Sequence, residues 1–110
     1  MPTIYKVLGQ AAPAGTTNVD LYTVPSGRQA VVSSLTLTND TAAAATARIY
    51  VRVSGATASL SNALVYDVSL AANAVIALTL GITLGASDVL TVQTGTANAI
   101  TFMAFGQEVY

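Results

Sequence analysis

The 110-residue sequence contains no cysteine, no histidine and no tryptophan. Without cysteine there is no disulfide framework. Without cysteine and histidine, the usual zinc and iron sites and the Cys–His and Ser–His forms of nucleophilic catalysis are excluded. The lack of cysteine assigns no compartment, because it means only that the fold is indifferent to redox state.

Charged residues are also scarce, at 8% of the chain, against about 25% in ordinary soluble domains. Four Lys and Arg against five Asp and Glu give a formal charge of −1, so the basic surface of a nucleic-acid-binding protein is missing. A free domain of this size carries charge on about a quarter to a third of its surface positions. We therefore expect a surface of neutral polar side chains that is partly covered by neighbouring molecules.

Apolar and polar residues alternate with a period of two along most of the chain, which predicts β-strands. The clearest run is ARIYVRV, which places Ala47, Ile49, Val51 and Val53 on an inner face and Arg48, Tyr50 and Arg52 on an outer one. In the run 29–39 we expect Val31, Leu35 and Leu37 to face inward and Val32 outward. Later inward positions include Leu64, Tyr66, Val68, Ile76, Leu78, Leu80, Ile100, Phe102 and Ala104.

Turn-forming residues separate these runs at short intervals, as in Pro25–Gly27, Ala71–Asn73, Gly85–Asp88 and Gly95–Asn98. Counting the runs gives about eight short strands and no long amphipathic helix. The sequence predicts one domain over residues 1–110, an antiparallel β-sandwich of jelly-roll or immunoglobulin-like topology. The segment 9–17 (GQAAPAGTT) is small, polar and rich in Pro and Gly, so we expect an extended arm there.

The segment 68–87 is uncharged and long enough to cross a bilayer. It contains Asn73, two glycines and several hydroxyl residues, and its β-branched positions alternate, so we interpret it as buried strands and expect no membrane association. The first ten residues lack the basic-then-apolar pattern of a secretory signal, and we expect none.

No group of residues suggests catalysis, and we expect a non-enzymatic protein without metal or cofactor. The acidic residues are scattered. Asp40 and Asp88 lie in turn sequences and should accept local hydrogen bonds, whereas Asp20 and Asp67 fall on outward strand positions, either solvated or paired with a basic neighbour. No acidic cluster suits calcium, and no glycine-rich loop precedes a helix.

The stripe Arg48, Tyr50 and Arg52 is the best candidate for an interaction surface, because Arg and Tyr are enriched in protein interfaces. The alternative is a solvated strand face whose charges prevent association with the sheets of other molecules. Tyr5 and Lys6 near the start, and Tyr110 at the end, lie in segments that could pair with a neighbour's sheet edge or only with each other. An aromatic platform for sugars would have to use Tyr50 or Tyr66.

Long segments of the chain resemble small virion proteins of tailed bacteriophages, particularly phages of cyanobacteria and aquatic bacteria. The resemblance lies in YKVLGQAAPAGTTNVDLYTVPSGRQAVVSSLTLTN at the start, ARIYVRVSGA in the middle, and LTLGITLGASDVLTVQTG followed by ITFMAFGQEV at the end. It implies a β-sandwich virion component with no active-site residues.

Two roles follow from this resemblance as expectations. The first is a capsid decoration (cement) protein that binds the major capsid protein or other virion proteins and is assembled into virions in the host cytoplasm. We expect it to form a homo-oligomer, with a trimer at local threefold positions as the expected form. The second is a tail or fibre-associated structural or carbohydrate-binding module.

Overall fold

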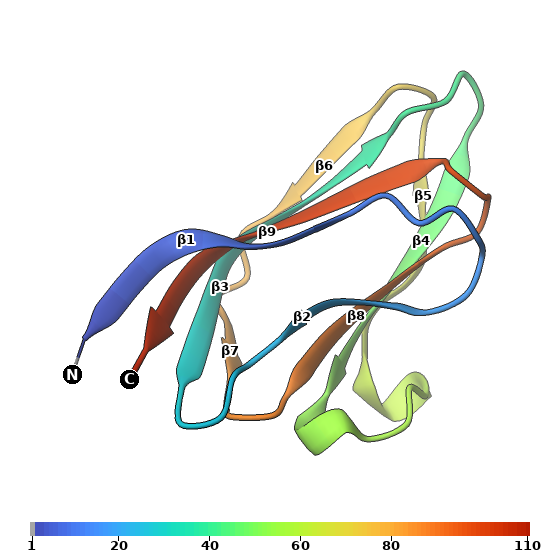
Figure 1. The fold of residues 1–110 in the computed structure, drawn as a ribbon. Helices are drawn as coiled ribbons and strands as arrows, with labels where there is room; N and C mark the ends of the chain where they lie inside the picture. The colour runs from blue at the N-terminus through green and yellow to red at the C-terminus, as the bar shows by residue number, and fades with distance from the viewer. Residues whose placement is uncertain (1) are drawn as a thin grey trace.

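The computed structural model describes residues 2–110, which form nine β-strands, two short 3-10 turns and no α-helix (Figure 1). The strands are β1 (Thr3–Ala11), β2 (Val19–Thr23), β3 (Gln29–Asn39), β4 (Ala45–Arg52), β5 (Ala63–Leu70), β6 (Val75–Leu78), β7 (Ile82–Leu84), β8 (Val89–Thr94) and β9 (Ile100–Val109). The 3-10 turns are η1 (Val53–Gly55) and η2 (Leu60–Asn62), between β4 and β5.

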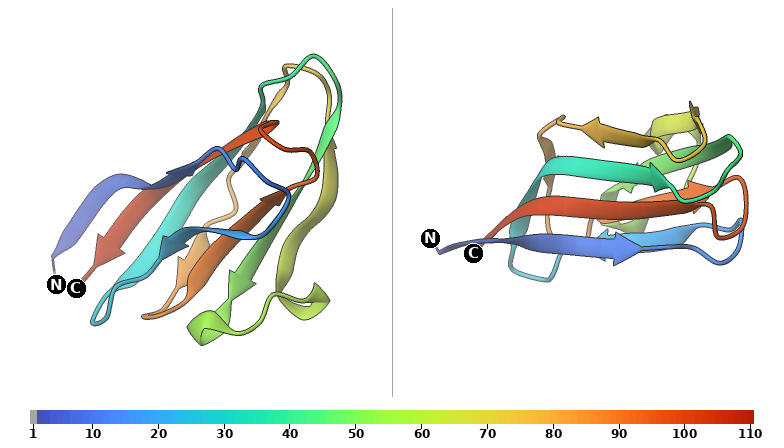
Figure 2. Two further views of the ribbon diagram at one scale, coloured as in Figure 1. Left: turned by 45° about the vertical axis from the view of Figure 1, so that its right-hand side comes forward. Right: turned by 90° about the horizontal axis from the view of Figure 1, so that it is seen from above.

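The strands form two antiparallel sheets that pack face to face, which confirms the predicted sandwich (Figure 2). One sheet has the order β1-β9-β3-β6, with β7 also paired to β3, and the other has the order β2-β8-β4-β5. If β6 and β7 are counted as one interrupted strand, consecutive strands alternate between the sheets except at the β4–β5 hairpin. This is the connectivity of the eight-stranded jelly roll, so the topology decides between the two predicted alternatives.

Inward-facing side chains of both sheets fill the space between the layers. Phe102 on β9, Leu35 and Leu37 on β3, Ile49 on β4 and Leu90 on β8 are fully buried there. The alternation that predicted Ile49, Leu35, Leu37 and Phe102 as core residues is confirmed. Arg48 and Arg52 lie on the opposite, outer face of β4, as predicted.

A β-bulge reverses part of the predicted pattern in β3. Val32 pairs with Gly106 and Ser34 with Phe105, which leaves Ser33 as an extra residue on β3. Val32 is fully buried and Val31 is only half-buried, so the prediction of Val31 inward and Val32 outward was wrong. One extra residue shifts the alternation by one position, and every side chain on one side of it changes face.

The inward assignments at β5 and β6 also need correction. Leu64 and Tyr66 are exposed, whereas Val65 and Val68 pack against the core, because β5 is bulged opposite β4. The run predicted around Ile76 to Leu80 ends at Leu78, and Leu80 is exposed. Gly81, at φ +63°, separates β6 from β7, and both short strands pair with β3.

The predicted turns are found where expected. Arg28 N–H donates to the Pro25 carbonyl, and the turns after β5, β7 and β8 each place a residue, Asn73, Ser87 or Asn98, in the left-handed region. The segment 9–17 divides between two roles: residues 9–11 complete β1, and residues 12–18 connect it to β2 in the other sheet. Within residues 2–110, no helix has the length and apolar character needed to cross a membrane.

Candidate functional site

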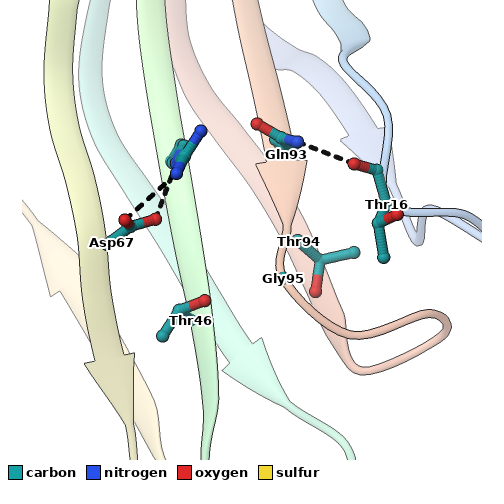
Figure 3. Close-up of a pocket in the computed structure, with 7 residues that line it drawn as sticks. Thr16, Thr46, Asp67, Gln93, Thr94 and Gly95 are labelled. Atoms are coloured by element: carbon teal, nitrogen blue, oxygen red, sulfur yellow. Dashed lines mark hydrogen bonds and ion pairs between the residues drawn. The ribbon is translucent and has the colours of Figure 1, made fainter.

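A polar groove of about 390 Å³ lies on the outer face of the β2-β8-β4-β5 sheet (Figure 3). A row of side chains crosses neighbouring strands here: Asp67 on β5, Arg48 on β4 and Gln93 on β8, with Thr16 of the β1–β2 connection beyond. The groove is lined by Thr16, Thr46, Arg48, Asp67, Gln93, Thr94 and Gly95. We call this set the polar groove.

A β-bulge builds the Arg48–Asp67 pair at the centre of the groove. Ala47 pairs with Val68 and Ile49 with Val65, so two residues of β5, Tyr66 and Asp67, lie opposite Arg48 alone. Both contact it. Asp67 receives two hydrogen bonds, from Nε at 2.6 Å and Nη2 at 3.1 Å, and the guanidinium carbon lies 4.0 Å from the centre of the Tyr66 ring.

Both charges of this pair are stabilised by the contact. The hydrogen bonds from Arg48 lower the pKa of the Asp67 carboxyl, and the hydrogen bond to Asp67 raises the already high pKa of Arg48. Because both groups are substantially exposed, solvent screens the attraction. The pair thus fixes geometry and charge state more than it adds stability.

The far wall of the groove is the β1–β2 connection and the turn after β8. Gln93 donates from Nε2 to the Thr16 carbonyl at 2.6 Å, a contact drawn in Figure 3. Gly95 N–H donates to the Thr46 carbonyl at 2.8 Å. A Cβ atom at Gly95 would overlap the Thr46 hydroxyl, so glycine allows this close approach without displacing the Thr46 side chain.

The other two residues of the predicted Arg48–Tyr50–Arg52 stripe have structural contacts. Tyr50 is only 5% exposed, so the expectation of an outward aromatic surface at this residue is corrected. Arg52 donates to the carbonyls of Gly55 and Ala56 and to Asp20, and so ties the η1 segment to the sheet. Of the stripe, Arg48 is the residue that lines the groove.

The terminal candidate residues lie at the opposite end of the sandwich, where β1 and β9 pair with each other. Tyr5 is 79% exposed on the edge strand β1. Lys6 forms an ion pair with Glu108, and the Arg28 guanidinium lies 4.0 Å from the centre of the Tyr110 ring. Tyr5, Lys6 and Tyr110 therefore share this end of the molecule, whereas Arg48, Tyr50 and Arg52 lie on the other sheet.

Glu108 is a buried carboxylate between the two sheets. It accepts hydrogen bonds from Tyr22 Oη at 2.5 Å, Arg28 Nη1 at 2.8 Å and Lys6 Nζ at 3.4 Å. The Tyr22 hydrogen bond, followed by those from Arg28 and Lys6, lowers the pKa of Glu108 although burial opposes this. Burial and the neighbouring carboxylate raise the pKa of Tyr22.

The remaining acids also have partners within the chain. Asp20 pairs with Arg52, as Asp67 does with Arg48, so of the two alternatives left open for these acids the structure shows pairing with a basic neighbour. Asp88 accepts from the backbone N–H groups of Gly85 and Ser54, and Asp40 accepts from the Thr101 hydroxyl. Within residues 2–110, no three His, Cys, Asp or Glu side chains are grouped to hold a metal ion.

No family model matches the sequence, and no curated protein matches it. Among solved structures, a chain in the structure of infectious bursal disease virus, Gx strain, is similar. The TM-score is 0.49 at 16% identity, over 97% of this chain and 31% of that one. The present chain thus spans less than a third of the length of that chain, and no inference about function follows from a likeness of this strength.

Several of these residues were not singled out by the sequence. Thr16, Thr46 and Gln93 meet only because three non-consecutive segments lie side by side, and no spacing along the chain signals that. The sequence did contain a signal for the burial of Glu108. Continuing the alternation of Ile100, Phe102 and Ala104 by four residues places Glu108 on the inner face.

Proposed function

We propose that this chain is a non-enzymatic structural protein of a tailed-phage virion, and specifically a capsid decoration protein that binds the assembled shell. This proposal rests on one observation, namely that the charged side chains of the chain are paired within it. All nine charged side chains lie within residues 2–110, and each makes a hydrogen bond or ion pair within the chain.

A surface without free charges suits a protein that is covered by neighbours. Charged groups left unpaired at an interface lose hydration, and interface centres are accordingly depleted of charge. The exposed surface also carries large apolar side chains on three separate parts of the fold. Tyr5 and Val7 lie on β1, Val53 and Leu60 on the η1–η2 segment, and Val75 on β6. Contacts on several sides are what a unit in a lattice needs.

The edge strand β1 supports self-association within this proposal. Tyr110 N–H donates to the Pro2 carbonyl at 3.0 Å, so Pro2 and Tyr110 form a hydrogen-bonded pair. Because hydrogen-bonded and non-hydrogen-bonded pairs alternate along antiparallel strands, the backbone N–H and C=O groups of Thr3, Tyr5 and Val7 point away from β9. The half of β1 from Thr3 to Val7 is exposed and contains a single charge, so it lacks most of the features that protect edges from pairing. We propose a closed homo-oligomer, with a trimer as the expected form.

Particle stability tests the decoration role. Phage particles prepared with and without the chain are heated, and release of the packaged genome is followed with a DNA-binding dye. Because a ligand that binds only the assembled shell stabilises it by mass action, particles without the chain should open at lower temperature, and adding purified protein should restore resistance. Equal resistance, or absence of the chain from purified particles, contradicts the proposal.

A tail or fibre-associated position is the second candidate. Electron cryomicroscopy of the same particles separates the two, because a decoration protein adds density at many positions of the shell. Density confined to the tail would contradict the decoration role and would agree with a structural role in the tail.

Sedimentation velocity tests the oligomer. Tyr5→Pro removes an outward-facing backbone donor from the edge of β1, where proline is tolerated, whereas Tyr5→Ser keeps that donor. We expect the wild type and Tyr5→Ser to associate and Tyr5→Pro to remain a folded monomer. A wild type that stays monomeric at high concentration contradicts self-association through β1.

A further inference from the structure

The polar groove lies apart from the strand edge through which self-association is proposed above. It lies on the β2-β8-β4-β5 sheet, whereas the free β1 edge belongs to the other sheet. Its volume of about 390 Å³ falls within the range of about 300–1,000 Å³ that is typical of small-molecule sites.

The groove presents both hydrogen-bond donors and acceptors that the fold leaves available. Gln93 uses its amide nitrogen on the Thr16 carbonyl, and its amide oxygen has no partner within residues 2–110. The Thr46 hydroxyl likewise makes no hydrogen bond to the described residues. Each Asp67 oxygen accepts one hydrogen bond from Arg48 and can accept more, and Arg48 Nη1 takes no part in that fork.

The electrostatic balance of the groove favours an uncharged ligand. Arg48 and Asp67 are the charged residues that line it, and they are paired with each other. An anion would have to compete with Asp67 for the guanidinium, and a cation would have to compete with Arg48 for the carboxylate. A neutral molecule can instead hydrogen-bond to both without separating them.

The central pair is held in place before any ligand arrives. Arg48 is fixed by the two-point contact with Asp67 on one side and by the Tyr66 ring on another. Asp67 has a φ of +56°, and among the five non-glycine residues with positive φ it alone lies within a strand. This conformation belongs to the bulge, Asp adopts it more readily than most residues, and it places the Asp67 side chain in the groove. Preorganised groups lose less entropy on binding.

We propose that the polar groove is a binding site for a neutral carbohydrate. A sugar hydroxyl both donates and accepts, so neighbouring hydroxyls match a surface on which acceptors (Asp67, Gln93) alternate with donors (Arg48, Thr46). Charge-assisted hydrogen bonds from Asp67 and Arg48 to these hydroxyls supply the stronger contacts. This site functions independently of the chain's place in a virion.

The test is a titration of the ¹⁵N-labelled chain followed by NMR. The neutral probes are glucose, galactose, mannose, N-acetylglucosamine, lactose and maltose. Inorganic phosphate and N-acetylneuraminic acid are the anionic probes. We expect at least one neutral sugar to shift the amide signals of Thr46, Asp67 and Gln93, with an affinity of about 1 mM or weaker for a single sugar unit.

Three variants locate the binding. Gln93→Ala and Asp67→Asn should each weaken the affinity by about tenfold or more, because the first removes an acceptor and the second replaces a charged acceptor with a neutral amide. Gln93→Ala leaves the Arg48–Asp67 pair in place, so it tests the groove even if Asp67→Asn disturbs the bulge. Tyr5→Ser, on the other sheet, should bind as the wild type does. Thermal melts check that the variants fold.

The proposal is overturned if none of the neutral sugars shifts these signals, if phosphate or N-acetylneuraminic acid binds in their place, or if Gln93→Ala binds the sugar as tightly as the wild type. If Gln93→Ala loses sugar binding but sediments as the wild type does, the assembly proposal is unaffected. The sugar-binding proposal and the assembly proposal can therefore fail independently.

Discussion

The buried carboxylate of Glu108 allows a sharp test of how the two sheets are held at the terminal end. Glu108→Gln keeps the shape of the side chain but removes its charge and replaces one acceptor oxygen with a donor NH₂ group. The two oxygens accept from Tyr22 on one side and from Arg28 and Lys6 on the other. Turned toward Arg28 and Lys6, the amide NH₂ group faces two donors. Turned toward Tyr22, it requires the Tyr22 hydroxyl to accept instead of donate, and in both orientations the charge-assisted hydrogen bonds are lost.

The size of the effect follows from the burial of the partners. Hydrogen bonds to a charged group contribute about 1.5–3 kcal/mol, and breaking a fully buried ion pair costs about 3–5 kcal/mol. Glu108 is 1% exposed, but the side chains of Arg28 and Lys6 are 33% and 44% exposed and can be hydrated once released. We therefore expect a loss of about 2–3 kcal/mol, which lowers the melting temperature by about 10 °C.

Urea unfolding at pH 7 measures this loss as a lower midpoint at unchanged slope. Lys6→Gln is the matched control, because its longer and more exposed contact should contribute less than about 1 kcal/mol. Equal midpoints for Glu108→Gln and the wild type would refute the reasoning.

The pH dependence gives a second test of the same group. The folded-state pKa of Glu108 is lowered, chiefly by the Tyr22 hydrogen bond, so its contribution is complete above the unfolded pKa of about 4.3 and is lost as the pH falls through the folded value. The difference in stability between the wild type and Glu108→Gln should therefore shrink as the pH is lowered from 7 toward 3. The other carboxyl groups are present in both proteins, so their contributions cancel in this difference. A difference that stays constant to pH 3 would mean that Glu108 does not carry the charge assigned to it.

Three further substitutions test the packing. Ile49→Asp places an unpaired charge in the core and should abolish folding by circular dichroism; a soluble variant that melts cooperatively would mean the face assignment of β4 is reversed. Gly106→Ala places a Cβ atom against the Val31 carbonyl and should cost about 1–3 kcal/mol in urea unfolding, whereas Gly15→Ala, with open space around it, should be nearly neutral. Asn39→Ala removes a buried side-chain NH₂ group whose two hydrogens are shared among three backbone carbonyls, and it should cost about 2 kcal/mol by the same assay. An unchanged midpoint would mean that these hydrogen bonds do not stabilise the fold.

The alternation of apolar residues was sufficient to predict the sandwich, because the period of a strand is a local property of the backbone. It placed Ile49, Leu35 and Phe102 in the core correctly. Turns were equally predictable, since Pro25–Gly27 and Gly95–Asn98 encode their own backbone conformations. The same alternation, carried to the end of β9, points Glu108 inward.

The pattern failed where a strand contains one residue more than its partner. At Ser33 and at Tyr66–Asp67, the side on which each residue lies depends on the register with the neighbouring strand, and no local pattern contains that register. The sequence also predicted an outward Arg48–Tyr50–Arg52 stripe but not the burial of Tyr50, which lies outside the core cluster.

The sequence by itself therefore determined an all-β chain with few charges, arranged in short antiparallel strands, because composition and periodicity are readable one segment at a time. Only the tertiary structure decided the jelly-roll order and the partners of each charge. It also decided the meeting of Asp67, Arg48 and Gln93 in one groove. These features depend on which distant strands lie side by side, and that choice is made by the packing of the whole chain at once.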